Sequence, residues 1–570
     1  MEPNSSPNTP TAAADASVRV PGAHPEPSGH PAGAHADTFT RDHLPPPEQW
    51  PELLLDDPAP RYPDRLNCGH ELLDRTVEER GADRPALLCG DGSAWSYGEL
   101  LETVDRVAHV LTEDLGVVPG NRVLLRGPTT PWLAACWLAV MKAGAVAVTV
   151  LAQARAAELA TICSLARIGH ALCDARSVRD LAEADVDGLR VTSFGGDAPG
   201  DLTRLAEARP GPYRAVDTAA DEVALIAFTS GTTGRPKGCM HLHRDLLAIA
   251  DTFSRHVLRP SADDVFAGSP PLGFTFGLGG LLVFPLRAGA STLLLEQAGP
   301  RQLLPALARH RVSVLFTAPT AYRTMLGQLE GHDLSALRRC VSAGENLPEA
   351  TWRAWYEATG LRIINGIGAT ELLHIFISAA DDAIRPGMTG VPVPGWQARV
   401  VDEHGDELPD GEPGLLAVRG PVGCRYLADP RQTEYVRHGW NMTGDTFVRE
   451  PDGYFRYVAR ADDMIISSGY NIAGPEVEDA LLRHPEVAEA AVVGRADELR
   501  GEIVVAHVVL TEGSEQTADS LRAHMKARLA PHKCPRLFVF QESLPRTATG
   551  KLQRFLLRDQ PGSPRARPLE

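Results

Sequence analysis

Short apolar runs alternate with amphipathic stretches through the first part of the chain. Runs typical of buried strands lie at residues 122–126, 145–151 and 223–229, and residues 131–142 have the pattern of a helix. Strands that alternate with helices in this way indicate an α/β domain with mostly parallel sheets. We expect this large N-terminal domain to span residues 45–460.

The pattern changes after Asp462. A helix is predicted near residues 475–483, followed by strands near 488–493 and 503–510 and a second helix near 518–529. This compact series predicts a small α+β domain over residues 461–558, with a short tail at 559–570. A chain of 570 residues is also too long for one compact domain.

The N-terminal segment has the composition of a disordered tail. Residues 1–38 contain seven prolines and no Leu, Ile, Phe, Tyr or Trp. Such a segment cannot bury enough apolar surface to offset the entropy lost on ordering. We therefore expect residues 1–44 to be disordered, and we favour a low-complexity extension over a docking segment.

The best candidate for a membrane span fails in detail. Residues 132–152 are rich in Ala, Val and Leu, but Lys142 lies near their middle and Gly144 follows it. A helix over 131–142, a turn and a buried strand over 145–151 explain this stretch better. The N-terminus also lacks the basic and apolar regions of a secretory signal. We predict a protein without membrane contact.

Charge and cysteine content narrow the class of protein further. The formal net charge is −17, and phosphate backbones require clustered Lys and Arg, so a nucleic-acid partner is disfavoured. Nine cysteines without a C-x-x-C pair form neither a disulfide framework nor a zinc knuckle. Free thiols are expected, which suits a cytoplasmic protein.

A glycine-rich loop carries the most chemical information. The apolar run 223–229 leads directly into Ser-Gly-Thr-Thr-Gly-Arg-Pro-Lys-Gly at 230–238, and residues 246–257 beyond it are spaced as one helix face. We expect the order strand, loop, helix. Glycine lets backbone amides approach an anion, hydroxyls add donors and Lys237 adds charge, which together make a phosphate cradle. The spacing differs from the Walker pattern and disfavours kinase or GTPase chemistry.

This loop, T-S-G-T-T-G-R-P-K-G, resembles the signature of the adenylate-forming superfamily, which includes acyl-CoA synthetases, adenylation domains of peptide synthetases, and luciferases. Five further motifs similar to those of the family follow in order, at 342–348 (SAGENLP), 365–371 (NGIGATE), 442–445 (MTGD), 460–478 and 545–554 (PRTATGKLQR). The resemblance covers about residues 45–555. It implies an AMP-binding N-terminal domain and a small mobile C-terminal domain.

The resemblance also implies an ATP site. The phosphates would lie against Thr229, Ser230, Gly231, Thr232, Thr233, Gly234 and Lys237. The adenine and the border of the acyl pocket would be formed by Gly344, Glu345, Asn365, Gly366, Ile367 and Gly368, of which Asn365 and Ile367 depart from the commonest residues. Asp445 and Arg460 would bind the ribose, and a carboxylate is a suitable acceptor for a vicinal diol.

Three residues would take catalytic roles by the same resemblance. Thr370 would contact the α-phosphate, Glu371 would hold Mg²⁺, and Lys551 takes the position of the essential lysine. Mg²⁺ is a hard cation that binds one or two carboxylates together with phosphate oxygens. The pair Thr370 and Glu371 also fits a helix N-terminus, with the threonine as its cap.

These roles imply two half-reactions with ATP, Mg²⁺ and coenzyme A. A carboxylate would attack the α-phosphorus and expel pyrophosphate, and a thiol would then attack the acyl-adenylate. In the family the small domain rotates between the steps. Asp462 would be the hinge, and Gly469 lies in the motif that enters the site for the thioester step.

Two segments, 269–280 and 368–378, are similar to benzoate-CoA ligases and especially to the 2-aminobenzoate type. By that similarity a flat aryl pocket would be lined by Phe274, Thr275, Phe276, His374 and Ile375. Gly366 and Gly368 would leave room for the ring, and His374 could orient an ortho substituent. If the region of Phe274 and Phe276 is a strand, one of the two belongs to the core.

The acid and the acceptor thiol have alternatives. Residues 270–280 lack the Asp expected for an α-amino group and the Asn expected for a salicylate-like starter, so both acids are disfavoured. No carrier motif follows Lys551, so the thiol is CoA or a free-standing carrier protein. An inactive homologue acting as a binding protein would have no need to keep Lys551, Glu371, Asp445 and Arg460 together. An aryl-CoA ligase acting on benzoate or 2-aminobenzoate is the leading hypothesis.

Overall fold

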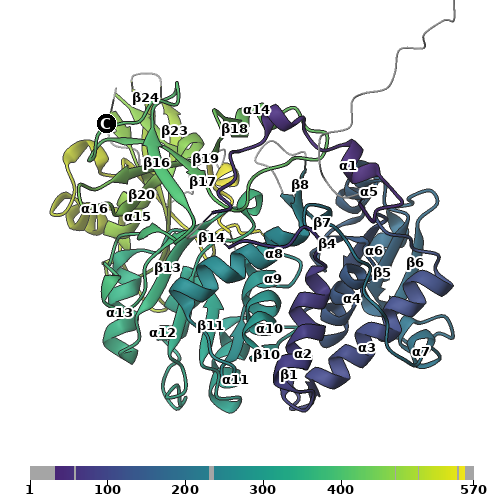
Figure 1. Ribbon diagram of the computed structural model, residues 1–570. Coiled ribbons are helices and arrows are strands. Elements are labelled where there is room, and N and C mark those ends of the chain that lie inside the picture. Colours follow the sequence, from purple (N-terminus) through teal and green to yellow (C-terminus); the bar gives the residue numbers. More distant parts are fainter. Residues whose placement is uncertain are drawn as a thin grey trace, which may run out of the picture.

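The computed structural model describes residues 33–56, 60–229, 236–468, 470–497, 500–547 and 551–558. Three sheets form the large domain, and a fourth belongs to the small domain at the C-terminal end (Figure 1). Most of the neighbouring strands in two of the large-domain sheets are parallel, which confirms the predicted fold class. The described residues contain no helix that is both long and apolar enough to span a membrane.

The first sheet has six strands in the order β6-β5-β3-β4-β7-β8. Its strands are β3 (Arg122–Arg126), β4 (Val146–Val150), β5 (His170–Asp174), β6 (Arg190–Phe194), β7 (Val223–Thr229) and β8 (Lys237–Leu242). The helices between its strands are α4 (Pro131–Lys142), α5 (Ala156–Ala166), α6 (Val178–Glu183) and α7 (Leu202–Glu207). The predicted helix at 131–142 is α4, which begins where the Thr130 side chain caps the amide of Leu133 and Pro131 follows as the first residue.

The second sheet has nine strands in the order β15-β14-β13-β12-β11-β9-β10-β1-β2. The strands are β1 (Pro85–Cys89), β2 (Ala94–Ser96), β9 (Val265–Gly268), β10 (Ser291–Leu294), β11 (Val314–Thr317), β12 (Arg339–Ser342), β13 (Ile363–Gly368), β14 (Ile375–Ser378) and β15 (Val391–Pro392). The helices that precede or connect its strands are α2 (Arg75–Arg80), α3 (Tyr97–His109), α9 (Thr275–Leu278), α10 (Phe284–Ala288), α11 (Pro300–Arg309), α12 (Pro319–Leu326) and α13 (Glu349–Thr359). Helix α8 (His243–Ile249) contacts β7 and β8 of the first sheet.

An antiparallel sheet completes the large domain and leads into the small one. It contains β16 (Gln397–Val401), β17 (Pro413–Arg419), β18 (Val436–Arg437), β19 (Trp440–Arg449) and β20 (Phe455–Arg460), with helix α14 (Gln432–Tyr435). The small domain contains β21 (Ile465–Ser467), β22 (Tyr470–Ile472), β23 (Val487–Asp497), β24 (Gly501–Leu510) and β25 (Leu537–Phe540), with α15 (Gly474–Leu482), α16 (Ala518–Lys526) and α17 (Arg554–Arg558). The helices and strands predicted there are all present.

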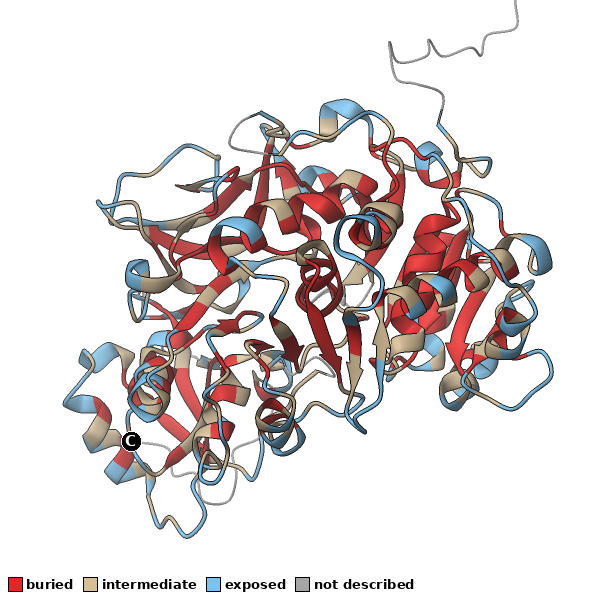
Figure 2. Cartoon of the chain, turned by 60° about the horizontal axis from the view of Figure 1, so that its bottom comes forward, coloured by how far each residue is buried: buried red, intermediate tan, exposed pale blue. Residues whose placement is uncertain are grey.

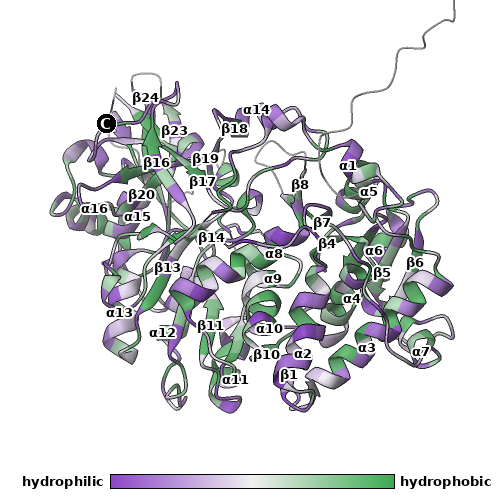
Figure 3. Cartoon of the chain, viewed as in Figure 1, coloured by the Kyte–Doolittle hydropathy of each residue, from purple (hydrophilic) through white to green (hydrophobic). Residues whose placement is uncertain are grey.

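Burial follows the sheets in both domains. Figure 2 shows buried residues concentrated on the strands and on the inner faces of the helices, and Figure 3 shows the same strands as mainly hydrophobic. The small domain has a core of its own around Val477, Val492, Leu521 and Phe538. All nine cysteines are free thiols, and eight of them are buried.

One predicted order of elements was wrong. The glycine-rich loop is followed by strand β8, and helix α8 begins only at His243. β7 and β8 pair antiparallel, with Thr229 opposite Lys237, so the loop joins the two strands of a hairpin. β8 also bonds to the segment that includes Arg425 and Tyr426 on its other side, and this pairing favours the strand.

The predicted start of the ordered chain at residue 45 was also wrong. Residues 33–44 pack on the large domain and include helix α1 (Phe39–Asp42). Phe39 is buried beneath the guanidinium of Arg122, 4.5 Å from its ring centroid, and Asp37 forms an ion pair with the same arginine. Asp37 and Phe39 lie at the end of a proline-rich segment, and the average composition of that segment gave no sign of their contacts. Residues 1–32 and 559–570 lie outside the described residues.

Candidate active site

Glu371 lies at the centre of a small polar cluster. It follows β13 in a single turn of 3₁₀ helix, Thr370–Leu372, and it is 8% exposed. The Tyr426 hydroxyl donates a hydrogen bond of 2.6 Å to its Oε1, and Lys237 Nζ lies 3.5 Å from the same oxygen. Both of these contacts engage the Oε1 atom of the carboxylate. One carboxylate beside a lysine fits a Mg²⁺ ion that takes its other ligands from phosphate and water.

The phosphate side of this cluster is formed by the β7–β8 hairpin. Lys237 at the start of β8 donates to the Tyr426 hydroxyl at 2.8 Å and lies over the Tyr426 ring. Within the part of the chain that the structure describes, the hydroxyl of Thr229 at the end of β7 is buried without a hydrogen-bond partner. Ser230, Gly231, Thr232, Thr233 and Gly234 lie outside the described residues.

A buried chain of polar groups supports the Thr370 backbone. His241 Nε2 is 2.9 Å from the Thr370 carbonyl oxygen, which can only accept, so this nitrogen carries the proton. Burial lowers the pKa of His241 to about 4 and keeps the ring neutral. Behind it, Arg425 NH1 donates to Asp245 Oδ2 at 2.9 Å, and both side chains are fully buried. Thr370 itself makes no side-chain cap, contrary to the capping role that we considered for it.

The N-terminal segment closes this buried chain from outside. The guanidinium of Arg425 lies 4.7 Å from the Trp50 ring centroid. Gln432 links the same region, because its Nε2 donates to the Gln49 carbonyl and its Oε1 accepts the Tyr426 amide. Residues 49–50 therefore help to fix the segment that presents Tyr426 to Glu371.

The buried pair of Arg425 and Asp245 leads to a stability prediction. Arg425→Met should lower the free energy of unfolding by about 3–5 kcal/mol, because it leaves the Asp245 carboxylate buried and uncompensated. Arg425→Met combined with Asp245→Asn should recover most of this loss. Urea denaturation of the three proteins measures the effect, and a double variant no more stable than the single one would contradict it.

The predicted ribose ligands meet on neighbouring strands. Asp445 on β19 is paired in register with Arg460 on β20, and Arg460 NH1 lies 3.3 Å from Asp445 Oδ1. Burial raises the pKa of Asp445, while Arg460 acts in the opposite direction. Arg460 Nε is also 3.5 Å from Asp462, the predicted hinge. Asp462 lies in the turn that follows β20 directly.

Lys551 reaches the same region from the small domain. Its ammonium lies 5.2 Å from the Phe274 ring centroid. Burial of the ammonium in the surrounding protein lowers the pKa of Lys551, and Glu371 and Asp445 act to raise it. The residue as a whole is nevertheless exposed to solvent. The structure thus brings the predicted catalytic lysine, the predicted metal ligand and the predicted ribose ligand around one space.

Glu345 faces the small domain. Its carboxylate accepts the Thr320 hydroxyl at 2.5 Å and pairs with Arg546 at 2.8 Å. Arg546 lies in the loop that carries Lys551, and Thr547 and Lys551 exchange hydrogen bonds within that loop. The side chain of Glu345 is therefore engaged by protein. Gly344 beside it has φ +86°, a conformation that favours glycine.

The residues predicted to line the aryl pocket differ in how deeply they are buried. Phe274 and Phe276 lie at the start of helix α9, so the strand considered for them was wrong. Phe274 is half-buried and faces Lys551, whereas Phe276 and Thr275 are buried. Ile375 fills the space beside Gly366, where an added Cβ would lie 2.7 Å from it, and a Cβ at Gly368 would meet the His374 carbonyl. These glycines therefore allow β14 to pack closely against β13. This packing role differs from the predicted one, which was to leave room for the ring of the substrate.

His374 is enclosed by phenylalanines. Phe253, Phe276, Phe284 and Phe316 lie with their ring centroids 4.6 to 6.3 Å from its own. Burial lowers the pKa of His374 to about 3, so the ring is neutral, and among the described residues neither of its nitrogens has a hydrogen-bond partner of good geometry. A buried polar group without a partner carries a desolvation cost that a bound ligand can relieve.

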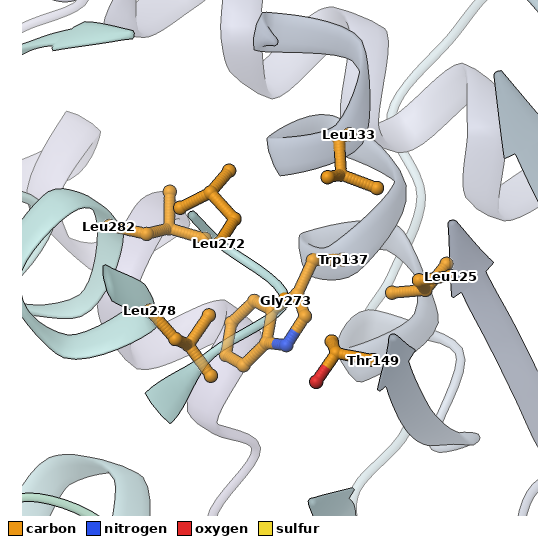
Figure 4. Close-up of a pocket in the computed structure, with 8 residues that line it drawn as sticks. All are labelled: Leu125, Leu133, Trp137, Thr149, Leu272, Gly273, Leu278 and Leu282. Atoms are coloured by element: carbon orange, nitrogen blue, oxygen red, sulfur yellow. The ribbon is translucent and has the colours of Figure 1, made fainter. Parts of the chain in front are cut away.

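A second, apolar space lies behind the Phe274 segment. Figure 4 shows it between α4, β3, β4 and the chain that includes Gly273. The lining residues are Leu125, Leu133, Trp137, Thr149, Leu272, Gly273, Leu278 and Leu282. Such a lining offers little to a triphosphate, so we assign this space to core packing and place the nucleotide near Glu371.

Several supporting residues were not found from the sequence. Three of them, Tyr426, His241 and Arg425, lie outside the six motifs. The fourth, Arg546, lies inside the C-terminal motif, but no role was predicted for it. Their partners are remote in the chain, since Tyr426 and Glu371 are 55 residues apart. The predicted thioester-loop residue Gly469 lies outside the described residues.

Comparisons with known proteins identify the family. The AMP-binding enzyme family matches residues 73–426, and the AMP-binding enzyme C-terminal domain matches residues 476–551. The chain is 35% identical over 521 residues to the benzoate-CoA ligase of Thauera aromatica, covering 88% of this chain and 97% of that protein.

Solved structures are similar over the same span. The anthranilate CoA ligase AuaEII in complex with anthranoyl-AMP has a TM-score of 0.83 at 32% identity, with 87% of this chain and 97% of that chain covered. A benzoate CoA ligase from Burkholderia xenovorans LB400 has a TM-score of 0.79 at 33% identity, with 87% and 100% covered. The chain belongs to the AMP-binding enzyme family, within the adenylate-forming superfamily, and is classed with the AMP-forming acyl-CoA synthetases. The resemblance seen in the motifs is thereby confirmed.

Proposed function

We propose that this protein is an ATP-dependent aryl-CoA ligase that activates benzoate or 2-aminobenzoate. The convergence of Lys551, Glu371 and the aromatic surface of Phe274 on one space carries the proposal. Relatives named for benzoate and for 3-hydroxybenzoate support the aryl class of acid, as does the anthranilate ligase structure. The domains act as an AMP-binding unit that includes the packed residues 33–44 and extends to residue 460, with a mobile unit over 461–558.

In the first half-reaction an oxygen of the aryl carboxylate attacks the α-phosphorus of ATP and pyrophosphate leaves. Two anions must approach, so the Lys551 ammonium lies between them and offsets their repulsion. Thr229 and Lys237 hold the departing phosphates, and Thr370 holds the α-phosphate. Glu371 would hold Mg²⁺, which would neutralise phosphate charge when bound. Asp445 and Arg460 fix the ribose, while residues 344–345 and 365–368 border the adenine.

In the second half-reaction the CoA thiol attacks the aryl-adenylate carbonyl and AMP leaves. The small domain turns about Asp462, which withdraws Lys551 and brings the motif around Gly469 to the site. No protein nucleophile is required, because the mixed anhydride is already activated. The same site thus serves two reactions in turn.

The preferred acid is set by the aryl pocket. Phe274 offers a ring face to the benzoate, and neutral His374 offers an unsatisfied nitrogen to an ortho substituent. A single contact of this kind discriminates by about 1–3 kcal/mol, or roughly 10- to 100-fold in kcat/KM. The pocket should therefore favour benzoate and 2-aminobenzoate over longer or aliphatic acids.

A panel of acids tests this proposal. AMP release is measured with ATP, Mg²⁺ and CoA for benzoate, 2-aminobenzoate, 2- and 4-hydroxybenzoate, cinnamate and octanoate. We expect kcat/KM for benzoate or 2-aminobenzoate to exceed that for cinnamate and octanoate about tenfold or more. His374→Phe should lower kcat/KM for 2-aminobenzoate more than for benzoate.

Three outcomes would contradict the proposal. Preference for octanoate would place the enzyme among aliphatic acyl-CoA synthetases. Aryl-adenylate formation without CoA turnover would indicate a carrier protein as the acceptor. A folded protein that releases no AMP with any acid would indicate an inactive homologue.

A further inference from the structure

The two domains meet through a small set of polar contacts. Arg483 on the small domain lies 3.4 Å from Glu349 at the start of α13, and Asp479 Oδ1 lies 3.5 Å from the Ala350 amide. Arg546 bridges Glu345 of the large domain and Glu489 of β23. Most of these are contacts between charged groups near the surface, which contribute little by themselves.

Arg323 makes a contact of a different kind. It projects from α12 of the large domain, and its guanidinium donates to three backbone carbonyls of the small domain. Nε lies 2.7 Å from the Ala488 oxygen, while NH2 lies 2.5 Å from the Val487 oxygen and 3.4 Å from the Leu482 oxygen. Among the described residues no carboxylate is in ion-pair contact with it. Burial lowers the pKa of Arg323, and Glu489 and Asp479 act against that shift from farther away.

The three carbonyls lie at the end of a helix and at the start of an edge strand of the small domain. Leu482 is the last residue of α15, and the carbonyls of a final helical turn lack partners within the helix. The same end carries the negative pole of the helix dipole, which favours a cation. Val487 and Ala488 begin β23, which ends the strand order β22-β21-β24-β23 and so presents a free edge. The planar fork of arginine suits several acceptors at once, which a lysine ammonium on a flexible stem does not.

This docking fixes which face of the small domain meets the active site. β23 and the β21–β22 hairpin lie at opposite ends of the sheet, so docking through β23 turns the hairpin outward. Ile466 and Tyr470 of that hairpin are 56% and 53% exposed, whereas Lys551 faces Phe274 in the site. The arrangement is therefore the one that the adenylation step requires.

We propose that Arg323 is a positioning residue for adenylate formation, which docks the small domain through the carbonyls of residues 482, 487 and 488. The inference rests on the proposed function, because it assumes that Lys551 acts in the first half-reaction. Rotation of the small domain would break all three hydrogen bonds, so Arg323 favours one of two domain positions and touches no substrate. Its loss should slow adenylation and spare the thioester step.

Two measurements on the full-length protein test this proposal. The first uses spin labels at Glu357→Cys on α13 and Lys526→Cys on α16, both exposed positions, in a Cys89→Ser background, because Cys89 is the one native cysteine that is not buried. Pulsed electron resonance then reports the distance between the domains. Arg323→Ala should broaden this distance distribution or move it to longer values, and Arg323→Lys should have an intermediate effect.

The second measurement separates the half-reactions. Hydrogen bonds from a charged donor are the stronger class, so Arg323→Ala should lower kcat for pyrophosphate release about 10- to 100-fold, with a smaller change in KM for ATP. Thioester formation from supplied benzoyl-adenylate and CoA should stay at or above the wild-type rate. Arg301→Ala, an exposed arginine on neighbouring α11, serves as the matched control and should change neither measurement.

The outcomes distinguish this inference from the proposed function. An unchanged distance distribution and unchanged pyrophosphate release in Arg323→Ala would overturn the role of Arg323. Equal loss of both half-reactions would also overturn it, because that indicates a general packing defect. If the wild-type protein formed no adenylate, the proposed function would fail, and the distance distribution would still decide whether Arg323 docks the domain.

Discussion

Replacing Lys551 with alanine is expected to slow adenylate formation by about a hundredfold or more, the usual cost of losing a preorganised charge at the reacting centre. The ammonium faces Phe274 and lies within the electrostatic influence of Glu371 and Asp445, where the carboxylate and the α-phosphate would meet. The effect should appear in kcat for pyrophosphate release. Thioester formation from supplied benzoyl-adenylate should remain near the wild-type rate.

An exposed lysine of the same domain gives the matched control. Lys526→Ala on α16 removes an equal charge far from the aryl pocket and should leave both half-reactions unchanged. If Lys551→Ala, in a folded protein, lost both half-reactions to the same degree, the assigned role would be wrong.

Replacing Glu371 with glutamine should reduce adenylate formation by about a hundredfold at low Mg²⁺, since it removes the carboxylate that we propose as the Mg²⁺ ligand. The glutamine is close in shape, so the Tyr426 hydroxyl that now donates to Oε1 at 2.6 Å can donate to the amide oxygen. The fold should be retained. The rate should recover in part as Mg²⁺ is raised, and a titration of pyrophosphate release against Mg²⁺ measures this.

Tyr426→Phe provides a graded comparison. It removes the hydroxyl between Lys237 and Glu371 and keeps the carboxylate, so the expected loss is smaller, about tenfold. A Glu371→Gln enzyme with the wild-type rate and the wild-type Mg²⁺ dependence would rule out the proposed metal ligand.

The sequence predicted those helices and strands whose conformation depends on neighbouring residues in the chain. Helix α4 and strand β7 occupy the predicted residues, because capping, proline position and continuous apolar runs act locally. Strand β8 was missed because its conformation depends on pairing with β7 on one side and with the segment around Tyr426 on the other. Phe39 and Asp37 were missed because their partner Arg122 is far along the chain.

The candidate site shows the same division. Motif resemblance proposed Glu371, Asp445, Arg460 and Lys551 as site residues, and the structure brings them near one another. The motifs could not identify the residues that support these side chains and position the small domain. His241, Arg425 and Arg323 act through buried backbone or ionic contacts whose partners lie 129, 180 and up to 165 residues away. Such contacts leave no periodic or spacing signal in one sequence.

The glycines illustrate a role that only packing reveals. Gly366 and Gly368 were interpreted as space for a substrate ring, yet Ile375 and the His374 backbone occupy that space. Their absent side chains allow β13 and β14 to pair closely beside Glu371. In the proposed acyl pocket, Phe274 and His374 are therefore the better candidates for contact with the ring than these two glycines.

The central claim is tested most directly by the stoichiometry of one reaction. Purified protein is incubated with ATP, Mg²⁺, CoA and either benzoate or 2-aminobenzoate, and AMP, pyrophosphate and the aryl-CoA thioester are quantified together. The account predicts equal amounts of the three products over many turnovers, with AMP and the aryl-CoA thioester formed only when both the acid and CoA are present. Formation of ADP and phosphate, or AMP release without any aryl-CoA, would contradict it.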